Sequence, residues 1–172
     1  NFLEDCNFPF SVIGKPSNIK NTLWVDNDNY NAMYGVVNEL ISFGHKEIAF
    51  IGGPETMNVS KDRFDGYKAA LKDNNLLYRS ELANHTKDFT EQTGYEIGAK
   101  LFSHESPTAI VTTDDVLSVG VSKFLKEEGK ESIAIVGFNN TPLAEYQQPP
   151  LASVDINAEQ LGYHGARLLI QF

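Results

Sequence analysis

One stretch of sequence decides the fold class: GHKEIAFIGGP, at residues 44–54. Its apolar part, Ile48–Ile51, is continuous and does not alternate with polar residues, and Ile133–Val136 has the same character. Strands of this kind are buried on both faces, because helices cover a parallel sheet from both sides. Gly44 stands where the end of a helix needs a residue in the left-handed conformation. The stretch therefore predicts a helix that ends at Gly44 and a buried parallel strand after it.

The same alternation of strand and helix continues along the whole chain. Apolar residues recur at helical spacing between the apolar runs, and a last helix begins at Asn157 with a capping-box spacing to Gln160. This alternation indicates βαβ units and an α/β fold with a mostly parallel sheet. The predicted strands are residues 10–13, 22–25, 48–51, 82–83, 108–111, 133–136 and 151–154.

Composition and charge exclude several classes of protein. The chain has 172 residues, enough for about one domain. Its 14 Lys and Arg against 23 Asp and Glu give a net charge of −9, so its field repels nucleic-acid phosphates. No apolar run approaches the roughly 18 residues of a membrane span. Cys6 is the single cysteine and has no internal disulfide partner, which favours the cytoplasm.

The two ends of the sequence indicate a segment of a larger protein. The chain does not begin with Met, and its last predicted helix runs to Phe172 without a stop signal. The chain is also expected to open directly on a strand.

Polar side chains follow the predicted strands, where ligands bind in open α/β sheets. They are Arg63, Asp114 and Asn139, and the aromatic Phe89 lies in another of these loops. Arginine and carboxylates can each hold two neighbouring hydroxyls, and a ring can cover the apolar face of a sugar. Structural alternatives remain open: Arg63 as a solvated or salt-bridged helix residue, Asp114 and Asp115 as helix-start acids, Phe89 as core and Asn139 as a turn residue.

Signals of catalysis are poor. No dinucleotide or phosphate-binding loop follows a strand, and the four histidines occur singly without metal-ligand spacing. We therefore expect a protein that is not an enzyme, with neither cofactor nor metal.

Five motifs, in order along nearly the whole chain, resemble the effector-binding domain of the LacI/GalR family of transcriptional repressors. They are LISFGHKEIAFIGGP (40–54), RFDGYKAAL (63–71), PTAIV (107–111), VGFNNTPL (136–143) and PPLASV (149–154). Around residues 138–148 the chain looks most like the maltose-operon repressors of Gram-positive bacteria.

The resemblance implies a periplasmic-binding-protein-like fold, with two Rossmann-like parallel-sheet lobes that close on a small sugar. It assigns residues 1–46 to the remaining part of the amino lobe, 47–148 to the carboxyl lobe and 149–172 to the crossover back. A helix-turn-helix headpiece and part of the amino lobe are expected to precede this segment.

The resemblance also implies roles for site residues. Arg63 would hold sugar hydroxyls, Phe89 would stack on the sugar, and Asp26 and Tyr30 would contribute from the other lobe. The family commonly has Asn-Asp where this chain has Asp114-Asp115, and Asp in place of Asn139. A carboxylate and an amide have thus traded places, which changes the pattern of hydroxyls being read.

The function implied is a sugar-sensing domain of a cytoplasmic repressor of maltose and maltodextrin genes. Its partners would be a maltose-like sugar, operator DNA through the headpiece, a second copy in a homodimer, and a phosphocarrier protein as candidate co-repressor, with no membrane involved. The alternative is an exported sugar-binding protein of an ABC transporter, which has the same fold.

Overall fold

The computed structural model of the chain describes residues 2–6, 8–17 and 22–171. The predicted ranges 1–46 and 149–172 also include residues 1, 7, 18–21 and 172, which lie outside the described residues. The chain forms two compact units. The larger is residues 29–156, and the smaller combines the residues up to Asp28 with those from Asn157 onward.

The larger unit is built on a five-stranded parallel sheet with the order β4-β3-β5-β6-β7. Its strands are β3 (Ile48–Gly52), β4 (Ala83–His85), β5 (Ala109–Thr112), β6 (Ala134–Phe138) and β7 (Ala152–Val154). Its helices are α2 (Asn29–Ser42), α3 (Asn58–Asp73), α4 (Glu91–Phe102), α5 (Asp115–Glu127) and the short α6 (Pro142–Glu145), with a 3₁₀ turn η1 (Ser80–Leu82).

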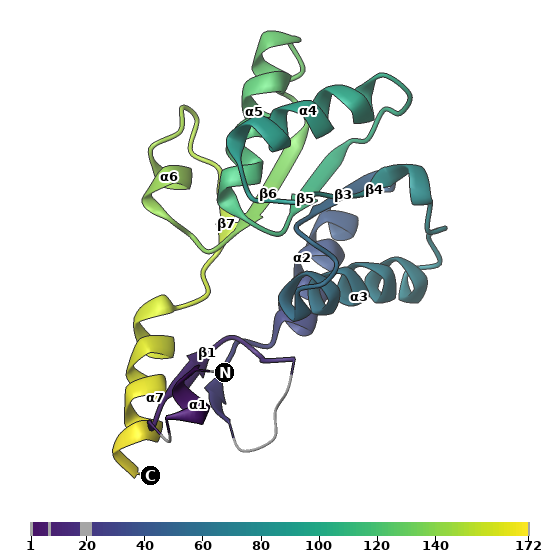
Figure 1. Cartoon of the computed structure of the whole chain (residues 1–172). Helices are drawn as coiled ribbons and strands as arrows, with labels where there is room; N and C mark the ends of the chain where they lie inside the picture. The colour runs from purple at the N-terminus through teal and green to yellow at the C-terminus, as the bar shows by residue number, and fades with distance from the viewer. Residues whose placement is uncertain (1, 7, 18–21, 172) are drawn as a thin grey trace. The chain divides into compact units, whose positions relative to one another are not determined.

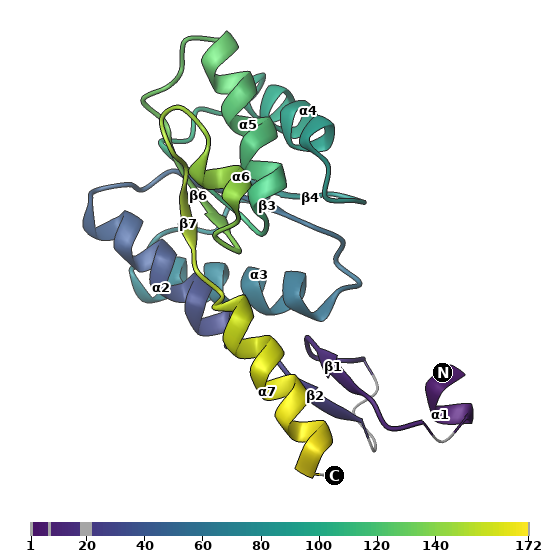
Figure 2. The ribbon, with the colours of Figure 1, turned by 90° about the vertical axis from the view of Figure 1, so that its left-hand side faces the viewer.

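Helices cover both faces of this sheet, as Figures 1 and 2 show, with α2 beside α3 on one face and α4 beside α5 on the other. Successive residues of β3 pack into the hydrophobic cores on opposite faces of the sheet. Ile48 and Phe50 join the cluster under α2 and α3, whereas Ala49 and Ile51 join the cluster under α4 and α5. All of β3 is therefore buried, as the continuous apolar run predicted.

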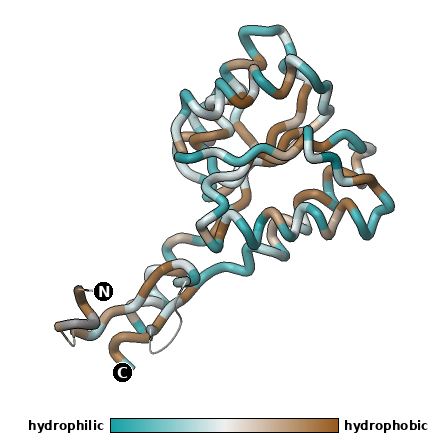
Figure 3. Tube along the Cα trace, turned by 45° about the vertical axis from the view of Figure 1, so that its right-hand side comes forward, coloured by the Kyte–Doolittle hydropathy of each residue, from teal (hydrophilic) through white to brown (hydrophobic). Residues whose placement is uncertain are grey.

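The helices are amphipathic, and in Figure 3 hydrophobic brown bands alternate with hydrophilic teal ones along them. The pair α2 and α3 approach closely at Gly66, where a Cβ atom would lie 2.3 Å from the carbonyl oxygen of Tyr30. Only glycine fits this crossing. The close contact brings the start of α2 within side-chain reach of α3.

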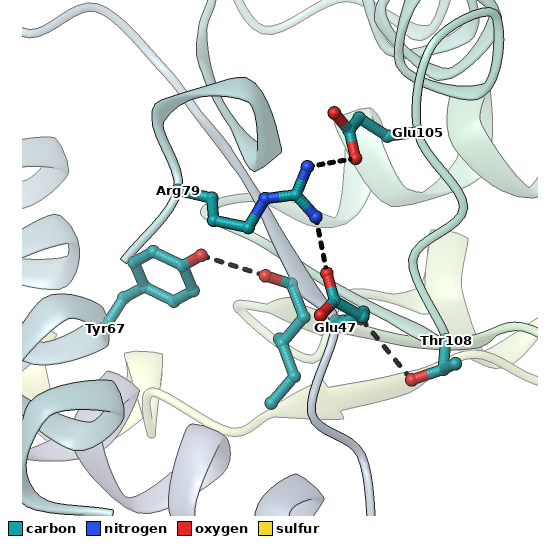
Figure 4. Close-up of polar contacts among 6 residues, drawn as sticks. Glu47, Tyr67, Arg79, Glu105 and Thr108 are labelled. Atoms are coloured by element: carbon teal, nitrogen blue, oxygen red, sulfur yellow. Dashed lines mark hydrogen bonds and ion pairs between the residues drawn. The ribbon is translucent and has the colours of Figure 1, made fainter. Parts of the chain in front are cut away.

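The amino-terminal end of the sheet is held by an ion-pair cluster, drawn in Figure 4. Arg79 donates to Glu47 at 2.8 Å and to Glu105 at 2.7 Å. Glu47 directly precedes β3, and its carbonyl accepts from the backbone N–H of Thr108 before β5 at 2.8 Å. Nearby, the buried Tyr67 hydroxyl donates to the Ile48 carbonyl at 2.9 Å, and burial raises the Tyr67 pKa. These contacts join three loops at the amino-terminal end of the sheet, opposite the end where the predicted binding residues follow the strands.

The smaller unit contains α1 (Phe2–Asp5), two short parallel strands, β1 (Ser11–Ile13) and β2 (Leu23–Val25), and α7 (Ala158–Gln171). The Ser11 hydroxyl donates to the Gly165 carbonyl at 2.9 Å, which ties β1 to α7. At the start of α7, the side chain of Asn157 accepts from the Gln160 N–H at 3.4 Å, as the capping-box spacing predicted.

Every predicted strand is present, with ends that coincide or differ by one or two residues. The structure adds α1, so the chain does not open on a strand as expected, and it adds α6 and η1. The compact units group α2 with the sheet of the larger unit. The predicted lobe ranges 1–46, 47–148 and 149–172 stay predictions, because they describe lobes of a longer protein.

Candidate functional site

Arg63 is a buried arginine at the carboxyl-terminal end of the sheet, on the second turn of α3, with 4% of its surface exposed. Its Nε donates to Asn29 Oδ1 at 3.0 Å, and its Nη1 donates to the carbonyl of Thr113 at 2.7 Å. The guanidinium carbon lies 4.1 Å from the centre of the Phe138 ring. A buried cation needs such polar and aromatic partners. Arg63 is therefore not the solvated helix residue that was the alternative interpretation.

Asp114 ends the loop after β5 and caps α5. Its Oδ1 accepts from the Val116 N–H at 2.8 Å, and its Oδ2 accepts from the Asn139 amide at 2.7 Å. Burial raises the pKa of Asp114 above its ordinary value, and the neighbouring Asp115 carboxylate raises it further, against the lowering effect of the Val116 N–H, Arg63 and Asn139. The Asp114 carboxylate therefore caps α5 with one oxygen and binds the Asn139 amide with the other.

Asn139 directly follows β6 and has a φ of +100°. Asparagine tolerates this left-handed region better than most residues. Its backbone N–H donates to the carbonyl of Val154 at 3.0 Å, which fixes it to β7. The interpretation of Asn139 as a turn residue is therefore correct. In this turn the Asn139 side chain also reaches Asp114.

Asp115, next to Asp114, is a buried carboxylate that bonds to neighbouring loop and strand residues. It is fully buried, and its Oδ2 accepts from the Thr141 N–H at 2.7 Å and the Thr141 hydroxyl at 2.8 Å. Its Oδ1 accepts from the Ser153 hydroxyl at 2.6 Å. Asp115 ties the loop after β6 to β7, so the two neighbouring acids have different surroundings.

Phe89 lies over the loop that follows β3. A Cβ atom at Gly53 would lie 2.0 Å from the Phe89 ring, so the ring rests directly on that glycine. The Gly53 N–H donates to the Thr113 hydroxyl at 2.9 Å, and the Thr113 carbonyl is the acceptor used by Arg63. Phe89 is half-buried and also packs against the core under α4 and α5.

The structure therefore brings four predicted residues to one end of the sheet through Thr113, Gly53 and Phe138: Arg63, Phe89, Asp114 and Asn139. Asp26 lies in the smaller unit, where its carboxylate accepts from the backbone N–H groups of Lys15 and Asn27. Tyr30 lies in the larger unit, on the first turn of α2, and its ring stacks on Tyr34. Tyr30 as a whole is 40% exposed.

Sequence reasoning missed two residues: Asn29, which bonds to Arg63, and Ser153, which bonds to Asp115 beside this group. Asn29 gives no local signal of its role, because its partner Arg63 lies 34 positions away on another helix. Ser153 gives no local signal at all, because its partner Asp115 lies 38 positions away.

The arrangement offers a cation, carboxylate and amide oxygens, and an aromatic ring at one sheet end, a set that suits a polyhydroxylated ligand. Among residues 2–6, 8–17 and 22–171, no cluster of three His, Cys, Asp or Glu could hold a metal ion. No helix within these residues is long and apolar enough to cross a membrane.

Comparisons with known proteins extend these observations. A family model described as a periplasmic binding protein-like domain matches residues 37–172. The chain is 34% identical over 174 residues to the HTH-type transcriptional regulator MalR of Streptococcus pneumoniae, a match that covers 95% of this chain and 49% of that regulator. The chain spans about half the length of the curated relatives it matches.

Solved structures give the same result. The crystal structure of a putative transcriptional regulator LacI from Bacillus cereus subsp. cytotoxis superposes with a TM-score of 0.90 at 42% identity, over 98% of this chain and 61% of that one. The complex of the transcriptional regulator CelR with cellobiose also gives a TM-score of 0.90, at 29% identity, over 98% of this chain and 53% of that one.

Proposed function

Because the chain belongs to the periplasmic binding protein-like family and is an effector-binding domain of the LacI-family type, we propose that its effector is a maltose-like, glucose-based di- or oligosaccharide. The family and the fold agree with those predicted from the sequence. The named relatives are transcriptional regulators rather than enzymes, which suggests that this chain is not an enzyme.

One observation carries the sugar proposal: the hydrogen-bonded group of Arg63, Thr113, Asp114 and Asn139 at the carboxyl ends of β3, β5 and β6. Arg63 supplies donors and Asp114 supplies acceptors, the pairing that vicinal hydroxyls require. Phe89 lies beside them and presents a ring on which a pyranose could stack. Similarity to MalR and to a regulator solved with cellobiose supports a sugar as the ligand class.

The domain would regulate transcription in a longer cytoplasmic protein. In this proposal an operator-binding headpiece precedes the domain, and two copies form a homodimer. The net charge of −9 supports a separate DNA-binding part, because this chain alone repels phosphates. The sugar would bind one conformation better than another, and only that difference in affinity can shift the regulator.

The binding proposal is tested by calorimetric titration of the full-length protein with maltose, for wild type and Arg63→Ala. Loss of charge-assisted hydrogen bonds predicts a weakening of about 1.5 to 3 kcal/mol for each bond. Arg79→Ala is the matched control, because Arg79 lies in the ion-pair cluster at the opposite end of the sheet. Equal affinity of wild type and a folded Arg63→Ala variant would contradict the role of Arg63.

The regulatory proposal is tested by fluorescence anisotropy with operator DNA, with and without saturating sugar. Linkage requires sugar and operator to affect each other's binding reciprocally, typically by 1 to 3 kcal/mol. We expect operator affinity to fall when the sugar is added. A sugar that binds and leaves operator affinity unchanged would favour co-repression through a phosphocarrier protein, or the transporter-associated binding protein.

A further inference from the structure

The orientation of the Arg63 guanidinium depends on a side chain from another helix. Asn29 is the first residue of α2, and 3% of its surface is exposed. Its Oδ1 accepts from Arg63 Nε at 3.0 Å. The contact joins residues 34 positions apart and is buried.

The other partners of this guanidinium come from the sheet end. The Thr113 carbonyl accepts from Nη1 at 2.7 Å, and the Phe138 ring lies under the guanidinium at 4.1 Å. Each acceptor that holds a different guanidinium nitrogen restricts rotation of this planar group. The Thr113 carbonyl holds Nη1, and the Asn29 side chain holds Nε.

Asn29 is also the first residue of the larger unit. The chain passes from the smaller unit to the larger one between Asp28 and Asn29. The residue that opens the larger unit is therefore bonded directly to the arginine at the sheet end. The close crossing of α2 and α3 at Gly66 makes this bond possible.

We propose that Asn29 is a positioning residue for effector recognition, which holds the Arg63 guanidinium in the orientation that receives a ligand hydroxyl through the hydrogen bond from Arg63 Nε to Asn29 Oδ1. This inference rests on the proposed role of Arg63 in sugar binding. Asn29 acts through Arg63 and need not touch the sugar itself.

The test compares maltose affinity of the full-length protein for Asn29→Ala, Asn29→Asp, Arg63→Ala and the double variant Asn29→Ala/Arg63→Ala. Loss of one hydrogen bond to a charged group predicts a weakening of about tenfold to a hundredfold for Asn29→Ala. Asn29→Asp keeps an acceptor for Nε and should retain affinity. The double variant should bind no more weakly than Arg63→Ala, because the two residues act through one contact.

Asn38→Ala is the matched control. Asn38 lies on the same helix, donates to the Tyr34 carbonyl at 2.9 Å and accepts from the Asn74 amide at the end of α3. Its loss therefore also removes a contact between α2 and α3, but one that does not involve Arg63, and should leave maltose affinity unchanged. The proposal is overturned if Asn29→Ala binds like wild type, if Asn29→Asp loses as much affinity as Asn29→Ala, or if the effects of Asn29→Ala and Arg63→Ala add.

A second measurement needs no effector and separates this inference from the sugar proposal. The Nε–H of Arg63 is followed by ¹⁵N NMR, and its exchange with water should be slow in wild type and Asn29→Asp and faster in Asn29→Ala. If wild type fails to bind maltose while this pattern holds, the sugar proposal fails and the positioning contact stands. Identical exchange in wild type and Asn29→Ala overturns the positioning role.

Discussion

Asn139 donates a 2.7 Å hydrogen bond to Asp114, and the other oxygen of the same carboxylate caps α5 through the N–H of Val116. Two donors thus share one carboxylate, one on each oxygen. The exchange of amide and carboxylate that the resemblance to the LacI/GalR family predicts would therefore lie within a single hydrogen-bonded pair.

The first prediction follows from this pair. Asp114→Asn leaves one side-chain oxygen for two donors, so one of them loses its partner, at about 1 to 3 kcal/mol of stability. Asp114→Asn/Asn139→Asp should recover most of the loss, because the amide introduced at position 114 can cap α5 with its oxygen and donate to the new carboxylate. Urea unfolding measures the stability of the single variant and of the double variant. A double variant no more stable than Asp114→Asn would contradict the pairing, and a changed sugar preference in the double variant would support its role in specificity.

The second prediction concerns pH. Burial raises the pKa of Asp114 above the ordinary 3.8. A carboxylate accepts hydrogen bonds from sugar hydroxyls more strongly than a protonated carboxyl does. Maltose affinity should therefore fall on acidification, beginning at a higher pH than for an ordinary aspartate. Titrations between neutral pH and pH 4 measure the effect. In the Asp114→Asn variant, the part of the pH dependence of maltose affinity that comes from this carboxyl should disappear.

The same raised pKa has a consequence for stability, with the opposite sign. The folded state binds this proton more tightly than the unfolded state, so the Asp114 contribution to stability improves as pH falls through its folded pKa. The stability of wild type relative to Asp114→Asn should therefore rise on acidification. Unfolding curves of both proteins at several pH values test this, and a difference that is independent of pH would count against the raised pKa.

The third prediction concerns Phe89. Gly53→Ala places a methyl group where the Phe89 ring lies, since the added Cβ would come within 2.0 Å of it. The ring must move, which should destabilise the fold by about 1 to 3 kcal/mol and weaken maltose binding. Phe89→Ala removes the clash, so adding Gly53→Ala to Phe89→Ala should cost less stability than adding it to wild type, while maltose affinity stays low in both variants that lack the ring.

The control for that substitution is Gly35→Ala, on the exposed side of α2, where a Cβ meets no atom within 4 Å. It should stabilise the helix by about 1 kcal/mol and leave maltose affinity unchanged. Equal maltose affinity of Gly53→Ala and wild type would show that Phe89 belongs to the core alone.

The fourth prediction separates Asp115 from Asp114. Asp115→Ala leaves two groups of Thr141 and the hydroxyl of Ser153 without their buried acceptor, so we expect a loss of at least about 3 kcal/mol of stability. Ser153→Ala removes one donor to Asp115 and the acceptor of the exposed Asn140 N–H, and should cost less, about 1 to 2 kcal/mol. Denaturant unfolding checks the order, and a smaller loss for Asp115→Ala than for Ser153→Ala would refute this assignment.

Local patterns in the sequence were sufficient for the sheet and for much of the site. The continuous run at Ile48–Ile51 identified a strand buried on both faces, and Gly44 has the positive φ, +94°, expected after a helix. Arg63 and Asp114 were identified because both follow strands, where parallel sheets gather their loops at one edge.

The remainder depends on packing that no local pattern encodes. Asn29 meets Arg63 only because Gly66 lets two helices approach, and Ser153 meets Asp115 only in the register that pairs Phe138 with Val154. The four-residue helix α6 is too short to produce a periodic signal.

The discontinuous smaller unit has a consequence for the order of events during synthesis. The Ser11 hydroxyl bonds to the Gly165 carbonyl, a contact that spans 154 positions, whereas the larger unit is one uninterrupted stretch. A ribosome releases β1 and β2 long before α7, so these strands emerge without the helix they pack on, while residues 29–156 can fold as soon as they are complete. Once folded, that stretch is a fixed spacer instead of a long flexible loop, which reduces the entropic cost of bringing α7 back to β1. The larger unit would then complete its fold on the ribosome before the two separated halves of the smaller unit can pair with each other.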